Sequence, residues 1–330
     1  MNDGAANQLI CRRTALRGLL AMMASGIATQ RAYSGPIPRA IVVPFSAGGP
    51  SDLLARKIAE LLTISSGSSV IVENVVGAGG YVAMDEVLSR PRDGATLLLG
   101  NSGLLCSAPL LLKMPRGRDP QDTLVPICTT DSVPFLLFAG KDFSASNLTG
   151  LRQLFKESSN GLTFATNDIG SANHIAGETV LRRLGLKGIH VPYRNTNQGV
   201  IDVVKGRVQL GVFNWQNIHS FLEMDRAKVL AALSDTALEL IPQARSVTDQ
   251  GFGKFDIQGW NALFVASGTP QPVVDEYGRK MQSIFVESDI QAFIRRMGNI
   301  SSFRDQKNSI GFVNEEIQKY RNLLKQYRLI

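Results

Sequence analysis

The segment from Ile41 to Asp52, IVVPFSAGGPSD, constrains the fold of this chain more than any other. Three β-forming residues lead through a proline into a Ser-Ala-Gly-Gly loop, and the helical pattern LLARKIAELL follows. A helix start leaves backbone N–H groups unpaired and carries partial positive charge, so it suits an anion. Gly48 and Gly49 allow the backbone to approach a ligand closely. The segment predicts a strand, a tight loop and a helix, which form either a small anion site or an ordinary strand-to-helix connection.

The glycine loop does not match the patterns of nucleotide-binding sites. It has neither the GxGxxG of a dinucleotide site nor the lysine of an NTP-binding loop. The chain has three cysteines and three histidines, and none of them has the spacing of a metal site. No GxSxG nucleophile elbow occurs either. We therefore expect no cofactor, no metal ion and no catalytic residue.

Length and charge limit the classes of protein further. A chain of 330 residues with 44% hydrophobic content can bury a sizeable core and fits two lobes. Its formal net charge is +7, but the basic residues are scattered and form no stripe of the kind that nucleic acid requires. We expect a monomer with no nucleic-acid partner.

The first 34 residues have the pattern of an export signal. Arg12 and Arg13 precede an apolar run from Leu16 to Ala28, and small residues follow. This order defines a secretory signal, of the Sec type or, given the paired arginines, the twin-arginine type. The alternative is a membrane anchor, but the run is short and interrupted by glycine, and no later stretch has the roughly 20 apolar residues of a membrane helix. The pattern predicts a signal peptide at 1–34 and a periplasmic protein.

Strands and helices alternate after the signal. Predicted strands at 40–43, 70–73 and 96–100 are separated by predicted helices at 51–62 and 81–89. This order implies a parallel sheet with right-handed crossovers, and ligands of such sheets bind at the carboxyl ends of the strands. Three glycine loops, PFSAGG, GAGG and GNSG, fall at those ends. We therefore expect a ligand site at this edge of the sheet.

A second lobe of the same architecture is predicted to begin near Phe135. Its predicted strands and helices are 135–139, 148–158, 162–165, 174–185, 189–192, 198–205, 208–213 and 229–233. A strand at 259–267 and the helices after it would return to the first lobe. We expect 35–134 plus 259–330 to form domain 1 and 135–258 to form domain 2. Two lobes with facing polar strand ends predict a clamshell that closes on a ligand.

The cysteines beyond the signal are Cys106 and Cys128. In an oxidising compartment they can form a disulfide. The alternative is that both are small buried residues. The sequence leaves both interpretations open.

Six segments of the chain, in order, resemble the substrate-binding proteins of tripartite tricarboxylate transporters, the Bug receptors. They are VPFSAGGPSDLLAR, VENVVGAGG, DGATLLLGNSG, GSANHIAGE, HVPYR and WNALFVASGTP. The resemblance extends from about Pro38 to the C-terminus. It implies a type II periplasmic-binding-protein (Venus-flytrap) α/β fold, with a mostly parallel sheet flanked by helices in each lobe. It also implies that the protein binds a small organic carboxylate between the lobes and delivers it to membrane transporter subunits.

The resemblance implies a set of ligand-binding positions. In the first lobe they are Phe45, Ser46, Ala47, Gly48, Gly49, Asn101 and Ser102. In the second lobe they are Thr166, Asn167, Gly170, Ser171, Ala172, His174, Tyr193 and Asn214. Asp52 belongs to the same motif, but a carboxylate would repel an anionic ligand, so we expect it to brace the loop. For His174 a structural bond to its own loop is an alternative to a ligand contact.

Two residues depart from the family pattern in ways that bear on specificity. Asp168 stands where relatives carry a small residue; pointing inward it would disfavour a dicarboxylate, and pointing outward it is a solvated loop charge. Trp215 stands where relatives often carry an aliphatic residue. It would either stack on an aromatic acid or pack beneath the cleft.

Two classes of function remain. The first is a periplasmic solute receptor, which the export signal, the two lobes and the missing catalytic set favour. The second is an exported hydrolase of small carboxylic compounds on the same scaffold. The absence of a visible triad argues against the hydrolase, although the members of a triad can be far apart in sequence.

Overall fold

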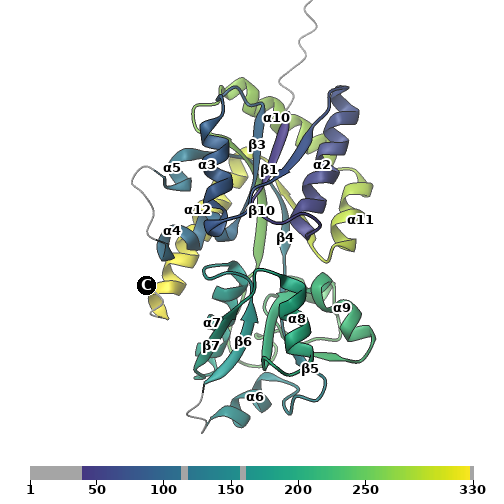
Figure 1. Ribbon diagram of the computed structural model, residues 1–330, viewed down its shortest axis with the longest axis vertical. Helices are drawn as coiled ribbons and strands as arrows, with labels where there is room; N and C mark the ends of the chain where they lie inside the picture. The colour runs from purple at the N-terminus through teal and green to yellow at the C-terminus, as the bar shows by residue number, and fades with distance from the viewer. Residues whose placement is uncertain (1–38, 113–117, 157–160, 328–330) are drawn as a thin grey trace, which may run out of the picture. The chain divides into compact units, whose positions relative to one another are not determined.

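The computed structural model of the protein describes residues 39–112, 118–156 and 161–327. The signal peptide predicted at 1–34 lies outside these residues. Within them the chain forms two α/β lobes, each built on one mixed sheet with helices packed on it (Figure 1). None of the described helices is long and apolar enough to span a bilayer.

The first sheet has six strands in the order β11-β4-β10-β3-β1-β2. Their bounds are β1 Ala40–Val43, β2 Ile71–Asn74, β3 Thr96–Asn101, β4 Leu124–Val133, β10 Gly259–Ala266 and β11 Ile300–Arg304. Strands β1, β2 and β3 pair in parallel, as the alternating pattern predicts. Strand β10 is antiparallel to both β3 and β4, and β11 is antiparallel to β4. Strands β1 to β4 therefore all run in one direction, and β10 and β11 run in the opposite direction, so the sheet is mixed.

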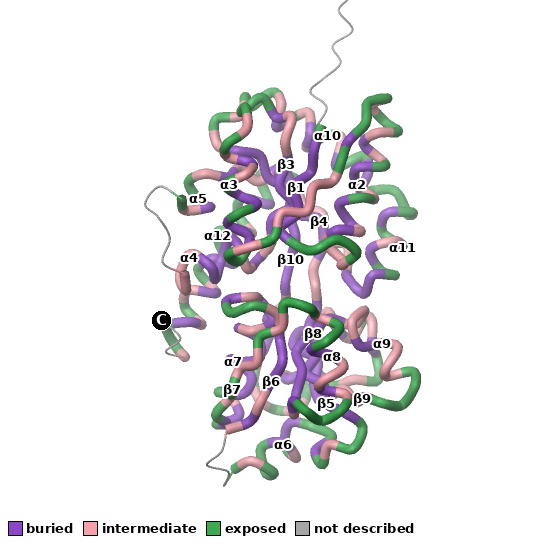
Figure 2. Tube along the Cα trace, in the orientation of Figure 1, coloured by how far each residue is buried: buried purple, intermediate pink, exposed green. Residues whose placement is uncertain are grey.

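Helices cover both faces of this sheet because its central strands are apolar on both sides. Ile41 and Val43 of β1 pack with α2 (Pro50–Ser66), α10 (Gln271–Phe285) and α11 (Ser288–Arg296). Val42 points the other way, toward α3 (Tyr81–Ser89) and α12 (Gln306–Gln326). Figure 2 shows the central strands as buried. The continuous apolar run in the sequence is thus a strand covered on both faces. The remaining helical segments of this lobe are η1 Ala78–Gly80, η2 Gly103–Ser107, α4 Ala108–Leu111 and α5 Pro120–Thr123.

The second sheet has five strands in the order β7-β6-β8-β5-β9. Its elements are β5 Phe135–Gly140, α6 Leu148–Phe155, β6 Leu162–Thr166, α7 Ala172–Arg183, β7 Gly188–Pro192, α8 Thr196–Val204, β8 Leu210–Asn214, α9 Trp215–Glu223, β9 Ala227–Ala232 and η3 Asp235–Glu239. Strands β6, β7 and β8 pair in parallel, and β5 is antiparallel to β8 and β9. The predicted ligand-binding residues Thr166 and Tyr193 lie at the carboxyl ends of the parallel strands β6 and β7.

Two strands of the first sheet are absent from the sequence-based assignment. Strand β4 has a proline and several polar residues, LVPICTTDSV, so it lacks a strand's apolar pattern. Strand β11, ISSFR, interrupts a region that we expected to be helical throughout. Both are antiparallel strands whose position is set by pairing with β10 and with each other, which local sequence does not encode.

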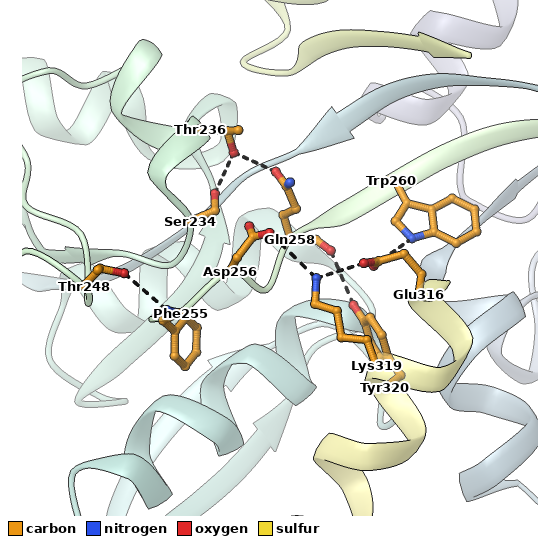
Figure 3. A network of polar contacts seen from close by, with 10 residues as sticks. All are labelled: Ser234, Thr236, Thr248, Phe255, Asp256, Gln258, Trp260, Glu316, Lys319 and Tyr320. Atoms are coloured by element: carbon orange, nitrogen blue, oxygen red, sulfur yellow. Dashed lines mark hydrogen bonds and ion pairs between the residues drawn. The ribbon is translucent and has the colours of Figure 1, made fainter. Parts of the chain in front are cut away.

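The junction between the lobes is braced by the last helix, α12 (Figure 3). Trp260 donates its indole N–H to Glu316 of α12 over 3.2 Å, and the Tyr320 hydroxyl donates to the Gln258 carbonyl over 3.4 Å. The Gln258 side chain in turn accepts a hydrogen bond from Thr236 of the second lobe over 2.8 Å. The strand that returns to the first sheet is therefore tied on both sides.

Candidate functional site

The first-lobe loop, Pro44–Gly49, joins β1 to α2. Residues Phe45 to Gly48 are exposed, and Gly48 has a φ of 83°, which favours glycine. Helix α2 begins at Pro50 with no side-chain cap on its first N–H groups. The loop therefore presents backbone and a helix start to solvent, as the sequence predicts.

Asp52 holds the first-lobe loop in shape from below. Its side chain is 1% exposed, and one oxygen accepts the Gly48 N–H over 2.8 Å and the Arg56 Nε–H over 2.9 Å. The other oxygen accepts from Asn74 over 2.9 Å, and Asn74 also bonds the Phe45 carbonyl. Burial alone would raise the pKa of Asp52, but these hydrogen bonds hold it below its ordinary value. Asp52 braces the loop, as expected.

The end of β3 carries the next two predicted site residues. Asn101 is half-buried, and its side-chain oxygen accepts the Leu104 N–H over 2.9 Å. Ser102 is 2% exposed and is the N-cap residue of the one-turn π-helix η2. Asn101 therefore holds the turn after β3, and its amide NH₂ group is not engaged in this contact.

The second-lobe loop, Asn167–Ser171, joins β6 to α7. Gly170 has a φ of 84°, and its N–H donates to Nδ1 of His174 over 3.1 Å. Ser171 occupies the N-cap position of α7 without making a cap bond. Its hydroxyl oxygen is buried and has no hydrogen-bond partner among the described residues. Ala172, the first residue of α7, is 8% exposed.

Three stacked rings support the second-lobe loop. The His174 and His190 rings lie 3.9 Å apart, and the Phe164 ring lies 5.2 Å from His190. Burial, with a smaller contribution from His190, lowers the pKa of His174 to about 3. Burial lowers the pKa of His190 to about 4. Both imidazoles are therefore neutral at neutral pH, and this loop offers an anion hydrogen-bond donors and no cation.

The strand end after β7 packs against the same loop. Tyr193 donates its N–H to the Thr166 carbonyl over 2.9 Å, and the Thr196 hydroxyl bonds the Asn167 side chain over 3.2 Å. The Thr166 hydroxyl is buried against His190 over 2.7 Å. The Tyr193 hydroxyl donates to Asp202 of α8 over 2.8 Å, so it is already engaged within the lobe.

Asn214 and Trp215 lie at the start of α9. Asn214 is 5% exposed, and its buried side-chain oxygen has no partner among the described residues. Trp215 stacks on His219 with ring centroids 4.5 Å apart. It also packs closely on Gly298 of the first lobe, where an added Cβ would lie 3.0 Å from the indole. These contacts favour packing over ligand stacking for Trp215.

The first-lobe and second-lobe site residues meet next to Gly103. A Cβ on Gly103 would lie 3.1 Å from the Asn101 oxygen and 3.9 Å from the Ser171 Cα. The Ser107 hydroxyl donates to the Gly170 carbonyl across the lobes. The structure thus brings Asn101 and Ser171, 70 positions apart in sequence, to the same place. Sequence reasoning missed Ser107, because nothing in GLLCSAP marks it as an interlobe contact.

Several alternatives left open by the sequence are settled by burial. Asp168 is exposed, which agrees with a solvated loop charge. Cys106 and Cys128 are both buried and free, so the disulfide is excluded. They lie in different hydrophobic clusters, on opposite faces of the first sheet. Within the described residues no group of His, Cys, Asp and Glu side chains could hold a metal ion.

Two hollows elsewhere on the protein have volumes of about 300 and 340 Å³. The first is lined by Arg92 and Arg118, among others, and the second by Arg183 and Lys319. Neither includes a predicted site residue. The candidate site is therefore described from the polar groups that converge at Gly103.

Curated relatives cover most of the chain. A UPF0065 protein of Bordetella pertussis is 33% identical over 274 residues, which are 83% of this chain and 82% of the relative. A UPF0065 protein from the tcbD-tcbE intergenic region of Pseudomonas sp. (strain P51) is 29% identical over 97% of this chain and 96% of its own length.

Solved structures share the fold. The periplasmic binding protein BugD has a TM-score of 0.76 at 26% identity, and MatC from Rhodopseudomonas palustris with bound malate has 0.77 at 25%. They cover 88% and 87% of this chain, and 97% and 98% of their own chains. R. palustris Rpa4515 with adipate, at 23% identity, has a TM-score of 0.81 over 88% of this chain and 97% of its own, and shows the fold alone.

The family model of the tripartite tricarboxylate transporter family receptor matches residues 54–329, well over half of the chain. Together with the two lobes, the polar loops at the strand ends and the BugD-like fold, this match makes the chain a member of the tripartite tricarboxylate transporter receptor family.

Proposed function

We propose that the protein is a periplasmic solute receptor that binds a small organic carboxylate between its two lobes and delivers it to membrane transporter subunits. The single observation that carries the proposal is the Ser171 hydroxyl, which is buried at the start of α7 without a partner among the described residues. Buried polar groups without partners are costly, so a bound acceptor would satisfy it. A carboxylate oxygen is such an acceptor, and the helix start adds N–H donors.

The first-lobe loop would hold the other end of the ligand through backbone donors. Ser51 and Asp52, at positions 2 and 3 of α2, have N–H groups without an acceptor among the described residues. The Gly48 N–H is already given to Asp52. We therefore narrow the expected contacts in this loop to the N–H groups at its end and at the start of α2.

The remaining expected site residues are kept as part of the proposal, with the roles that their contacts suit. Asn101 and Asn214 would present their amides to the ligand, since each has one engaged or buried oxygen and an NH₂ end that can donate. His174 and Tyr193 would support the loop from behind, because each has a hydrogen bond inside its own lobe. Domain 1 would comprise 35–134 and 259–330, and domain 2 would comprise 135–258.

The ligand class is proposed from a relative. MatC, which has 25% identity and the same fold, is described with bound malate, a small dicarboxylate. Asp168 lies in solvent here, so it places no negative charge against a second carboxylate. We therefore expect dicarboxylates of this size to be among the ligands. The hydrolase alternative receives no support from the family, and we propose that the protein is not an enzyme.

Export and assembly belong to the same proposal. BugD is described as a periplasmic binding protein, and the first 34 residues of this chain carry the export pattern. We propose that they direct the protein to the periplasm and that it acts as a monomer, as expected for a carrier that must dock on a membrane protein.

A thermal-shift and calorimetry screen tests the proposal. The panel holds malate, adipate, tricarboxylates, aromatic monocarboxylates and amino acids. A ligand that binds only the folded state raises the melting temperature. At a concentration of 100 times its Kd it adds about 2.7 kcal/mol to the free energy of unfolding. We expect a hit among the dicarboxylates, recovered unchanged after incubation. Chemical turnover of the bound acid would contradict the receptor, and an aromatic acid as the only hit would contradict the dicarboxylate class.

A further inference from the structure

A buried carboxylate lies two strands away from the proposed site. Asp131 of β4 is 0% exposed, and its neighbours are neutral hydrogen-bond donors. Asn261 of β10 donates to both of its oxygens over 3.1 Å, Asn299 donates over 2.6 Å, and the Thr130 hydroxyl donates over 2.7 Å. A carboxylate buried without a cation is costly, so these three donors are what keep it in place.

The carboxylate belongs to a row that reaches the site. In the ladder of the first sheet, Asn261 stands directly opposite Asp131 on one side and directly opposite Asn101 on the other. Residues directly opposite one another in paired strands project from the same face of the sheet. Asn101, Asn261 and Asp131 therefore form one polar row across β3, β10 and β4. Its first member holds the turn after β3 through the Leu104 N–H.

We propose that Asp131 is a positioning residue of the carboxylate site: by holding Asn261 it fixes the strand end that presents Asn101 to the ligand. This inference rests on the proposed function for its effect on binding, but its effect on Asn101 is independent of any ligand. When Asp131 takes up a proton, one of its oxygens changes from a hydrogen-bond acceptor into a donor. The side chains that donate to Asp131 must then rearrange.

One neighbour is built to take part in that rearrangement. The side-chain oxygen of Asn299 is buried and has no partner among the described residues, while its NH₂ group donates to Asp131. If the Asn299 amide rotates by half a turn, this oxygen can accept the proton of a neutral Asp131. The row therefore has two hydrogen-bonding states, and the charge of Asp131 selects between them. Burial raises the pKa of Asp131 to about 6, against the lowering effect of its three donors.

The other titratable groups packed against β4 are engaged elsewhere. Strand β10 has none, and Arg304 of β11 is directed to Thr129 and the Ser302 carbonyl. On the helices, Glu316 of α12 bonds Trp260, and buried Tyr277 of α10 donates to the Gly94 carbonyl. Tyr320 of α12 donates to the Gln258 carbonyl, and Asp122 of α5 is exposed.

The first test uses the wild-type chain without ligand. A ¹H–¹⁵N NMR titration from pH 5 to 8 follows the Asn261 side-chain amide and the Leu104 backbone amide. We expect both to shift with a common midpoint near pH 6, and both to be flat in Asp131→Asn. The stacked histidines do not interfere, because their pKa values are about 3 and 4. A Leu104 amide that stays still while Asn261 titrates, or two flat amides, would overturn the positioning role.

The second test measures malate affinity by calorimetry at pH 7.5 and 5.5. The ionisation of malate affects its binding to the wild type and to Asp131→Asn equally. Only the difference between the affinity losses of the two proteins is therefore informative. We expect the wild type to lose affinity by about threefold more than Asp131→Asn, a coupling typical of neighbours in one network. Exposed Asp122→Asn is the matched control and should follow the wild type. Identical profiles for wild type and Asp131→Asn would contradict the inference. If the wild type binds no malate, the result counts against the proposed function. In that case the positioning role is decided by the amide titration only.

Discussion

The first-lobe loop, Pro44–Gly49, and the second-lobe loop, Asn167–Ser171, are held in shape by different chemistry. The first-lobe loop is exposed and rests on an ionised, buried Asp52 that is paired with Arg56. The second-lobe loop is exposed at Asp168 and buried at Gly170, and it rests on a neutral stack of His174, His190 and Phe164. A carboxylate beneath the first loop shapes the backbone by accepting the Gly48 N–H and the Asn74 amide. Neutral rings beneath the second loop allow hydroxyl and N–H donors to be buried without bringing in a charge.

The difference teaches that neither loop brings a cation among the expected site residues, so the proposed carboxylate site would be assembled from neutral donors alone. In each loop the donors are backbone N–H groups or small side chains at a helix start, and the support is placed behind them. The two supports respond differently to mutation and to pH, and this provides ways to test the comparison.

The largest effect is expected from Asp52→Ala. The change leaves the Gly48 N–H, the Asn74 amide and Arg56 without their shared acceptor. We expect a loss of about 3 kcal/mol in the free energy of unfolding, measured by urea denaturation at pH 7.5. Exposed Glu60→Ala, on the same helix, is the matched control. Equal, small losses in the two variants would show that Asp52 does not support the loop.

Acid should weaken the second-lobe loop before the first. The folded-state pKa values of His174 and His190 are lowered to about 3 and 4, so the unfolded chain binds more protons below about pH 6.5. The stability they contribute is therefore lost as pH falls from about 6.5 toward 4. Asp52 has a lowered pKa too, but its contribution is lost only below about pH 4, the unfolded value.

Urea unfolding between pH 7.5 and 4.5 measures this order. We expect the wild type to lose at least about 2 kcal/mol more than a His174→Gln, His190→Gln double variant over this range. Asp131 acts in the opposite direction, because its raised pKa makes stability fall as pH rises from about 4 to 6. It is present in both proteins, so it cancels in the difference. Parallel pH profiles for the two proteins would show that the stacked histidines do not contribute to the pH dependence of stability.

Ser171→Ala and Asn101→Ala should separate binding from stability. The Ser171 hydroxyl has no partner among the described residues, so its removal should leave the melting temperature unchanged and weaken malate binding about tenfold, the worth of one hydrogen bond to a charged group. Asn101→Ala should also weaken binding, and it should cost about 1 kcal/mol of stability because Leu104 loses its acceptor. If both variants bind as the wild type does, the site lies elsewhere.

The smallest effect is expected from Asp168→Asn. The side chain is exposed on the second-lobe loop. We expect the melting temperature to stay within about 1 °C of the wild-type value, as for most surface substitutions, and malate affinity to stay the same. A marked gain in dicarboxylate affinity would place Asp168 in the pocket after all.

Much of the fold could be predicted because its signals are local. Strand β1 has the predicted bounds, and α3 begins directly after the GAGG loop, where Tyr81 was expected. Strands β4 and β11 could not be predicted, since their polar sequences are placed by pairing with β10 and with each other. The mixed pairing of both sheets could not be predicted for the same reason, because local sequence does not encode which strands pair.

The candidate site was predicted as a set of loops, but not as a set of contacts. Sequence indicated that Asn101 and Ser171 belong to polar strand ends, and only the fold places them beside the same glycine. It did not reveal that His174 stacks on His190, or that Tyr193 has already given its hydroxyl to Asp202. These depend on how separate elements pack, which no local pattern contains.

A crystal structure of the protein with malate, or with the tightest-binding acid of the screen, tests the central claim most directly. The account predicts one carboxylate within hydrogen-bond distance of the Ser171 hydroxyl and the opposite end of the ligand at the first-lobe loop, with no arginine or lysine contacting either. An acid held by one lobe alone, or bound through a basic side chain elsewhere, would contradict it.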